Sequence, residues 1–180
     1  IVPHQTHSNN VLIIDEEFQK LNPSDKINVL YGVDATITHL KDIFICATTA
    51  DCVPILLYDK KKGVIAAIHA GWKGVVNLII DDTVFKMKDA YQTDPIDIIA
   101  VIGPSISEKH YEIGEDVVSI FEKSNFNLSA ASFFNTKTNK LHLDLKKIAH
   151  NKLVELGIPS DQIDISNLCT YERADLFFSA

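Results

Sequence analysis

The 180-residue sequence contains a single arginine, Arg173, and carries a formal net charge of −7. Any anion bound by the chain must therefore meet Arg173, lysines or backbone amides. The negative charge argues against nucleic acid or an anionic membrane as a partner, because both attract a positive surface. No apolar run approaches the roughly 18 residues that a membrane span requires. The opening residues "IVPHQTHS" do not form a secretion signal.

Cysteine is also scarce, and the three that occur are Cys46, Cys52 and Cys169. An odd number of cysteines in a lysine-rich chain argues against a disulfide framework and for free thiols or metal ligands, so we expect a cytoplasmic protein. The sequence has no CxxC pair, which excludes a structural zinc site built from cysteines alone. It also lacks GxGxxG and GxxxxGK followed by Ser or Thr, so neither nucleotide-cradling loop is expected.

The length and composition fit one domain that spans residues 1–180, with 46% hydrophobic and 23% charged residues. The only methionine is Met87, so the chain starts at Ile1 without an initiator. We therefore expect this sequence to be a trimmed part of a longer protein, with some site residues outside it.

Hydrophobic periodicity predicts short strands interspersed with helices. The predicted strands span residues 11–15, 43–48, 53–59, 63–70, 96–104 and 163–170. The predicted helices span residues 75–90, 115–124 and 144–156. These elements predict a compact single domain of mixed αβ (α+β) class, with its strands covered on both faces. The charged turn "KKKG" favours a hairpin, which excludes a purely parallel sheet.

Reactive side chains cluster at strand ends and turns in three segments, which are "HQTHS" (4–8), "TTADCVPI" (48–55) and "IHAGWKG" (68–74). If the strands that flank the "KKKG" turn pair as a hairpin, residue 53 faces about residue 69. Cys52 then lies one step from the position opposite His69. The small residues Ala70 and Gly71 follow His69. Their size raises the question of whether they leave space for another group to approach the His69 ring.

Each candidate side chain has an ordinary interpretation when it is taken alone. Cys52 would be a small buried hydrophobe, His69 a core histidine, and His7 a solvated residue near an exposed end. Together they supply two nitrogens and one sulfur, which suit a Zn²⁺ site with one position open to water or substrate. Without a metal, Cys52 and His69 would form a nucleophilic pair that attacks an amide. Both interpretations remain open at this point.

Several separate motifs occur in the order and spacing of one known family. They are "HQTHS", "TTADCVPILLYD", "AAIHAGWKG", "VIGPSISEKHYEIGEDV", "LHLDL" and "LCT…DLFFS". In these motifs the chain resembles the laccase-domain family, first described as multicopper polyphenol oxidases and now viewed as zinc-dependent purine nucleoside phosphorylases. The resemblance covers nearly all of the chain. It implies a core of mixed, β-sandwich-like strands flanked by helices, distantly similar to Cys–His toxin deamidases.

The resemblance also implies a reaction and a metal. His7, Cys52 and His69 are expected to bind Zn²⁺, with copper as an alternative or adventitious metal. The implied substrates are purine nucleosides and phosphate, with adenosine deaminase and methylthioadenosine phosphorylase as further activities. The family's arginine- and glycine-rich N-terminal segment and its C-terminal arginines are missing here, and both would contact substrate. We expect a monomer or a small homo-oligomer.

Trp72 and Lys73 are the candidate substrate contacts. Lys73 places a positive charge beside the free amides of a predicted helix start, which suits an anion, or it is a solvated surface lysine. The family often has arginine at this position. Trp72 stacks on the purine base or closes over the core.

Two rival functions carry over from the residues. One is a metal-free Cys–His hydrolase or deamidase that uses Cys52 and His69. The other is a copper-dependent polyphenol oxidase, which seven histidines with no HxH pair disfavour because multicopper sites need many histidine ligands. A non-enzymatic binding domain would leave the three-ligand set without a purpose.

Overall fold

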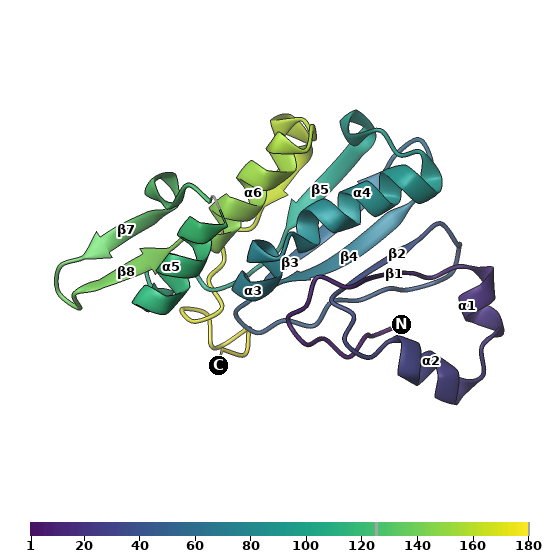
Figure 1. Cartoon of the computed structure of the whole chain (residues 1–180), viewed down its shortest axis with the longest axis horizontal. Helices are drawn as coiled ribbons and strands as arrows, with labels where there is room; N and C mark the ends of the chain where they lie inside the picture. Colours follow the sequence, from purple (N-terminus) through teal and green to yellow (C-terminus); the bar gives the residue numbers. More distant parts are fainter. Residues whose placement is uncertain (125, 180) are drawn as a thin grey trace.

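A computed structural model describes residues 1–124 and 126–179 of the chain. Its main sheet has six strands, in the order β1 (Val11–Ile13), β2 (Ala35–Thr38), β4 (Ile65–Ala70), β3 (Val53–Asp59), β5 (Ile98–Ile102) and β9 (Ile163–Ile165). The two outer pairs, β1 with β2 and β5 with β9, are parallel, and the inner pairs are antiparallel. The sheet is therefore mixed, which confirms the predicted fold class (Figure 1).

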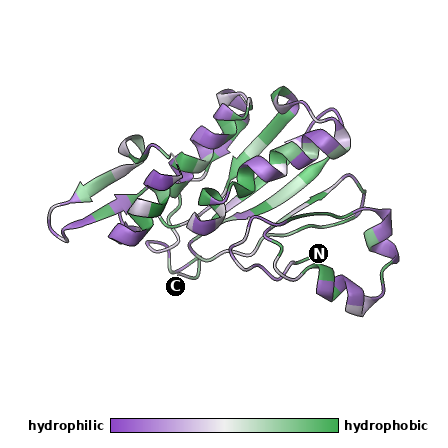
Figure 2. Ribbon diagram, viewed as in Figure 1, coloured by the Kyte–Doolittle hydropathy of each residue, from purple (hydrophilic) through white to green (hydrophobic). Residues whose placement is uncertain are grey.

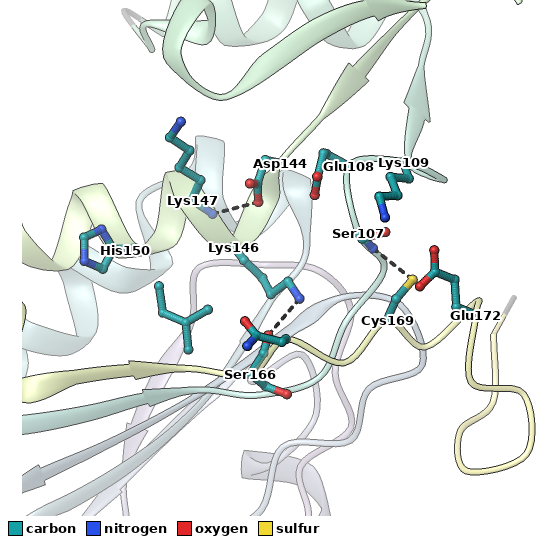
Figure 3. A pocket seen from close by; sticks show the side chains of 12 residues that line it. Ser107, Glu108, Lys109, Asp144, Lys146, Lys147, His150, Ser166, Cys169 and Glu172 are labelled. Atoms are coloured by element: carbon teal, nitrogen blue, oxygen red, sulfur yellow. Dashed lines mark hydrogen bonds between the residues drawn. The ribbon is translucent and has the colours of Figure 1, made fainter.

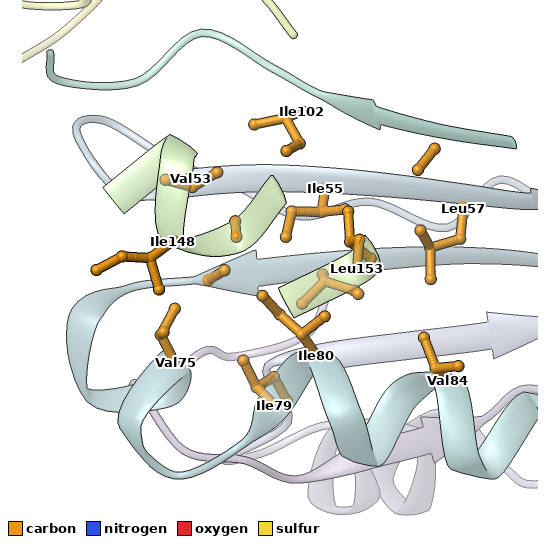
Figure 4. Packing of buried hydrophobic residues seen from close by; sticks show 14 of the residues in the cluster. Val53, Ile55, Leu57, Val75, Ile79, Ile80, Val84, Ile102, Ile148 and Leu153 are labelled. Carbon is orange, nitrogen blue, oxygen red and sulfur yellow. The ribbon is translucent and has the colours of Figure 1, made fainter. Parts of the chain in front are cut away.

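Two helices, α4 (Ile79–Tyr91) and α6 (Leu145–Glu155), cover one face of this sheet (Figure 1). Figure 2 shows the strands of the sheet as mainly apolar and the two helices as apolar on one side and polar on the other. The fully buried Ile80 and Leu153 pack with Ile55 and Leu57 of β3 in the core (Figure 4). Each such side chain contributes about 1.5–3 kcal/mol when it is buried. Packing against the two helices thus holds the sheet in place, and the sheet in turn positions the residues at the ends of its strands.

The opposite face of the sheet is partly open among the described residues. Leu56 and Tyr58 of β3 are 52% and 44% exposed, and Ile99 and Val101 of β5 are each 40% exposed. Their neighbours in sequence are buried, so the strands alternate between a covered and an uncovered side. The prediction that these strands are covered on both faces is wrong for this chain. We name Leu56, Tyr58, Ile99 and Val101 the outer strip.

A second, three-stranded sheet extends from the body of the molecule (Figure 1). Its antiparallel order is β6 (Glu112–Ile113), β8 (Lys140–Leu143) and β7 (Ser132–Asn135). Helix α5 (Glu115–Lys123) follows β6, and its Phe121 is fully buried against Phe126. Near the N-terminus lie two short helices, α1 (Glu16–Lys20) capped by Asp15 and α2 (Pro23–Val29) capped by Asn22. Hydrophobic periodicity predicted neither this sheet nor these two helices.

Three predicted elements differ most from the observed ones. Residues 43–48 form no strand, because Cys46 and Thr48 bond to the N-terminal segment instead. The predicted helix 75–90 is two helices, α3 (Trp72–Val76) and α4, separated where Leu78 adopts a left-handed conformation with φ of 68°. The final strand is shorter than predicted and ends at Ile165.

The β3–β4 hairpin is confirmed, but its predicted register is wrong by one residue. The turn closes with the Asp59 amide donating to Val64 O, and Gly63 adopts a φ of +70°. His69 is therefore opposite Pro54, and Cys52 lies two residues before Pro54. Cys52 and His69 nevertheless meet at the open end of this hairpin, far from its turn.

Candidate metal centre

His69 lies near the end of β4, with its side chain buried at 4% exposure. Its Nδ1 is 2.7 Å from Oδ1 of Asp34, a residue that directly precedes β2 and is 1% exposed. Because the carboxylate accepts the proton on Nδ1, the lone pair of Nε2 remains available as a metal ligand. The neighbouring strand therefore fixes which nitrogen of His69 the site uses.

His7 belongs to the N-terminal loop and is exposed. Its backbone adopts a φ of 62°, in the left-handed region, and its amide donates to Oδ1 of Asp34 at 3.0 Å. Its ring meets the ring of His69 edge-on, with the centroids 4.8 Å apart. The Asp34 carboxylate thus contacts both histidines, through the ring of His69 and through the backbone amide of His7.

Cys52 completes the cluster from the entry of β3. Its Sγ lies 3.7 Å from Nε2 of His7. Burial raises the pKa of the Cys52 thiol to about 11, and the negative charges of Asp51 and Asp34 add to this rise. Burial also lowers the pKa of His69, although Asp34 opposes that shift. A thiolate–imidazolium pair is therefore disfavoured, whereas a divalent cation would deprotonate the thiol directly.

The ligand atoms of His7, Cys52 and His69 all lie within 4.8 Å of one another. A tetrahedral zinc ion would place a sulfur and a nitrogen ligand about 3.6 Å apart, from bond lengths of about 2.3 and 2.05 Å. The observed 3.7 Å between Cys52 and His7 matches that edge. Among the residues that the structure describes, this is the one group of three such ligands. The three donors are of the types that hold a metal ion in proteins.

Gly71 makes room for two of these ligands. A Cβ at this position would lie 2.8 Å from Cδ2 of His7 and 3.0 Å from Sγ of Cys52, both too close. The φ of Gly71 is −73°, so packing and not backbone conformation requires glycine here. The chain is therefore cleared beside His69, but the space serves His7 and Cys52.

A cavity of about 560 Å³ opens at the cluster. Gln5 closes one side of it with bonds to both backbone groups of Thr48, at 2.7 and 2.8 Å. The cavity is lined by Pro3, His4, Gln5, His7, Thr48, Thr49, Ala50, Asp51, Cys52 and His69. All three ligands face this cavity, so a molecule bound there would reach the open metal position.

Trp72 and Lys73 follow Gly71 at the start of α3 but do not line this cavity. Trp72 is half-buried and packs against the hydrophobic core. Lys73 is exposed, and its Nζ lies 5.6 Å from the centre of the Trp72 ring. Their roles as substrate contacts stay predictions.

A second cavity, of about 380 Å³, contains none of the three ligands (Figure 3). Cys169 lies in its wall and accepts a hydrogen bond from the Ser107 amide at 3.3 Å. The buried Lys146 donates to the carbonyls of Ser166 and Leu168. Of the lysines that line this cavity, Lys146 is therefore already engaged with the backbone.

A buried carboxylate behind two histidines and a thiol, at one end of a mixed sheet, defines a small αβ protein with a group of three side chains suited to hold a metal ion. The chain belongs to the multi-copper polyphenol oxidoreductase laccase family, which matches residues 1–180.

Two relatives match the whole chain. It is 42% identical to a protein named purine nucleoside phosphorylase from Bacteroides thetaiotaomicron, covering 100% of this chain and 67% of that protein. It is 41% identical to a protein named adenosine deaminase RL5 from an unknown prokaryotic organism, covering 100% of this chain and 68% of that protein. The crystal structure of YlmD from Geobacillus stearothermophilus superposes with a TM-score of 0.88 at 27% identity, over 99% of this chain and 66% of that one. The chain thus spans about two thirds of the length of its relatives.

Sequence reasoning did not find Asp34 or the role of Gly71. Asp34 lies in "YGVDATIT", where it resembles an ordinary loop acid, and its partner His69 is 35 residues away.

No helix in the described part of the chain is both long and apolar enough to cross a bilayer.

Proposed function

We propose that the protein is a zinc-dependent purine nucleoside phosphorylase, which converts adenosine, inosine or guanosine and phosphate to the free base and ribose 1-phosphate. The observation that carries this proposal is the cluster of His7, Cys52 and His69, with an open side that faces a cavity of about 560 Å³. The relative named purine nucleoside phosphorylase supports the choice of substrate. That choice rests on similarity and not on a contact in the cavity.

The residues of the chain divide the work of the site. His7, Cys52 and His69 would hold the ion, and Asp34 orients His69 through its Nδ1. A bound zinc ion supplies a positive centre that orients phosphate or lowers the pKa of a water molecule. The cavity has the volume of a typical small-molecule site, about 300–1,000 Å³. Lys73 and Trp72 stay proposed contacts to phosphate and base, one or two residues beyond Gly71.

Adenosine deamination is a second proposed activity, and the relative named adenosine deaminase RL5 supports it. A metal ion held by His7, Cys52 and His69 would supply a water molecule of lowered pKa for this reaction, so the same cavity would serve both activities. We propose methylthioadenosine phosphorolysis as a further activity, and a cytoplasmic location, which three free cysteines suit.

The rival functions fit the site less well. A metal-free hydrolase needs a thiolate, and burial raises the pKa of Cys52 to about 11. A multicopper oxidase needs several copper sites, whereas the described residues hold a single three-ligand group. A copper ion on the same ligands would still be compatible with their chemistry, because Cu²⁺ binds nitrogen ligands more tightly than Zn²⁺.

The test uses the full-length protein with its metal content measured by elemental analysis. Each nucleoside is incubated with and without phosphate, and base, ribose 1-phosphate and ammonia are followed by chromatography. We expect about one zinc per chain and base release that requires phosphate. Base release without phosphate would indicate hydrolysis, and ammonia alone would indicate deamination. No turnover of any nucleoside by zinc-loaded protein would refute the phosphorylase.

A further inference from the structure

Asp34 accepts several hydrogen bonds at the site. Its Oδ1 accepts from the His7 amide at 3.0 Å and lies 2.7 Å from Nδ1 of His69. Its Oδ2 accepts from the amides of Thr6 and Ser8 at 3.1 and 2.8 Å, and from the Ser8 hydroxyl at 2.8 Å. Four N–H groups therefore converge on one carboxylate that is 1% exposed.

The backbone of Asp34 extends the same connection. The Asp34 amide donates to Asn10 O at 3.0 Å, and the Asp34 carbonyl accepts from the His69 amide at 2.8 Å. The N-terminal loop and strand β4 thus meet at one residue, which directly precedes β2. Removing its side chain would leave several N–H groups without an acceptor.

We propose that Asp34 is the positioning residue of the metal centre: it holds His69 with Nε2 directed at the ion, and it holds the loop that carries His7. This role rests on the proposed zinc site, but it concerns groups that the chain itself supplies. A partner of this kind fixes the tautomer and the orientation of a histidine ligand, and its loss commonly lowers metal affinity 10- to 100-fold.

Asparagine is the informative substitution because it keeps the shape and removes the charge. Each carboxylate oxygen of Asp34 faces two N–H groups, and Oδ2 also accepts from the Ser8 hydroxyl. The NH₂ of an asparagine therefore meets at least two N–H donors in either orientation. Asp34→Asn should therefore disturb either the ring of His69 or the loop of His7. Neither arrangement preserves both ligands.

The matched control is Asp59→Asn. Asp59 is also fully buried and accepts from two consecutive backbone amides, Lys61 and Lys62, at 2.9 and 3.0 Å. It lies in the turn of the β3–β4 hairpin, at the end opposite the metal centre. Both variants remove a buried acceptor of loop amides, but only Asp34→Asn should act on the ligands.

The experiment measures zinc affinity by competition with a chromogenic chelator, and the His69 tautomer by long-range ¹H–¹⁵N NMR of the metal-free full-length protein. We expect a single Nδ1–H tautomer in the wild type. We also expect zinc to bind Asp34→Asn 10- to 100-fold more weakly, but Asp59→Asn within twofold of the wild type. A wild-type His69 with its proton on Nε2 would overturn the proposal, as would Asp34→Asn with wild-type zinc affinity.

The tautomer measurement needs neither zinc nor a folded variant. It therefore still decides the role of Asp34 if Asp34→Asn does not fold. If the wild type bound no zinc, the proposed function would fail, and the His69 tautomer would decide the positioning role separately.

Discussion

The substitution Gly71→Ala tests the geometry of the metal centre most directly. The new Cβ would lie 2.8 Å from Cδ2 of His7 and 3.0 Å from Sγ of Cys52, whereas ordinary contacts begin at 3.4 Å. The His7 ring must therefore retreat by about 0.6 Å, the difference between 3.4 and 2.8 Å. Metal–ligand distances tolerate only about 0.2 Å. The required shift exceeds that tolerance about threefold, so His7 should no longer reach the ion held by the other two ligands.

The cost to the fold should be small by comparison. His7 is exposed on a loop and can swing outward, so the apo protein should lose about 1 kcal/mol, the low end for overpacking. Zinc affinity should fall at least tenfold, which corresponds to about 1.4 kcal/mol or more. Chelator competition gives the affinity, and urea unfolding of the metal-free protein gives the stability.

Gly63→Ala is the control for this experiment. Nothing lies within 4 Å of its added Cβ, but its φ of +70° strains any other residue. That strain should cost about 1–2 kcal/mol and leave zinc affinity unchanged. If Gly71→Ala bound zinc as tightly as the wild type, the close contacts at Gly71 would not define the site, and the reasoning would be refuted.

Two further predictions concern a thiol and a carboxylate. Cys52→Ala should lose zinc binding and phosphorolysis while its circular dichroism spectrum stays native. Cys46→Ala should retain zinc binding and phosphorolysis. A Cys52→Ala protein that still binds zinc would contradict the assignment of Cys52 as a ligand. Asp59 has a lowered pKa: burial would raise it, but the amides of Lys62 and Lys61 and the side chain of Thr93 outweigh burial. Its contribution to stability should be complete above the unfolded pKa of about 3.9 and be lost as the pH falls through the lower folded value. Between pH 5 and about 2, the free energy of unfolding measured with urea should therefore fall more steeply for the wild type than for Asp59→Asn. Parallel pH dependences of the two proteins would contradict a stabilising role for the Asp59 carboxylate.

The hairpin and the approach of Cys52 to His69 could be predicted because their determinants are local. Two apolar runs flank a charged turn that ends in Gly63, so the pairing of β3 with β4 follows from the sequence. Periodicity alone could not give the length of the turn, and the register was wrong by one residue. The proximity of Cys52 and His69 survived that error because both lie at the same end of the hairpin.

The missed features depend on contacts that are distant in sequence. Strand β2 carries Thr36 and Thr38, which are fully buried although threonine is ordinarily exposed. Residues 43–48 are apolar enough for a strand, but their amides bond to Ile1 and Gln5, which no local pattern reveals. Leu78 interrupts a helical pattern without glycine or proline. The carboxylate of Asp34 could be recognised only once β2 was placed beside β4.

The outer strip has a consequence for how this 180-residue chain behaves in solution. Its molecules repel one another through a net charge of −7 and attract one another through apolar side chains that face water. Salt screens the repulsion, over a Debye length of about 10 Å at 0.1 M, and leaves the attraction in place. Sulfate strengthens the attraction further. We therefore expect the chain to be most soluble in dilute buffer, where repulsion between molecules exceeds apolar attraction. Concentrated sulfate should lower its solubility, because attraction then exceeds repulsion.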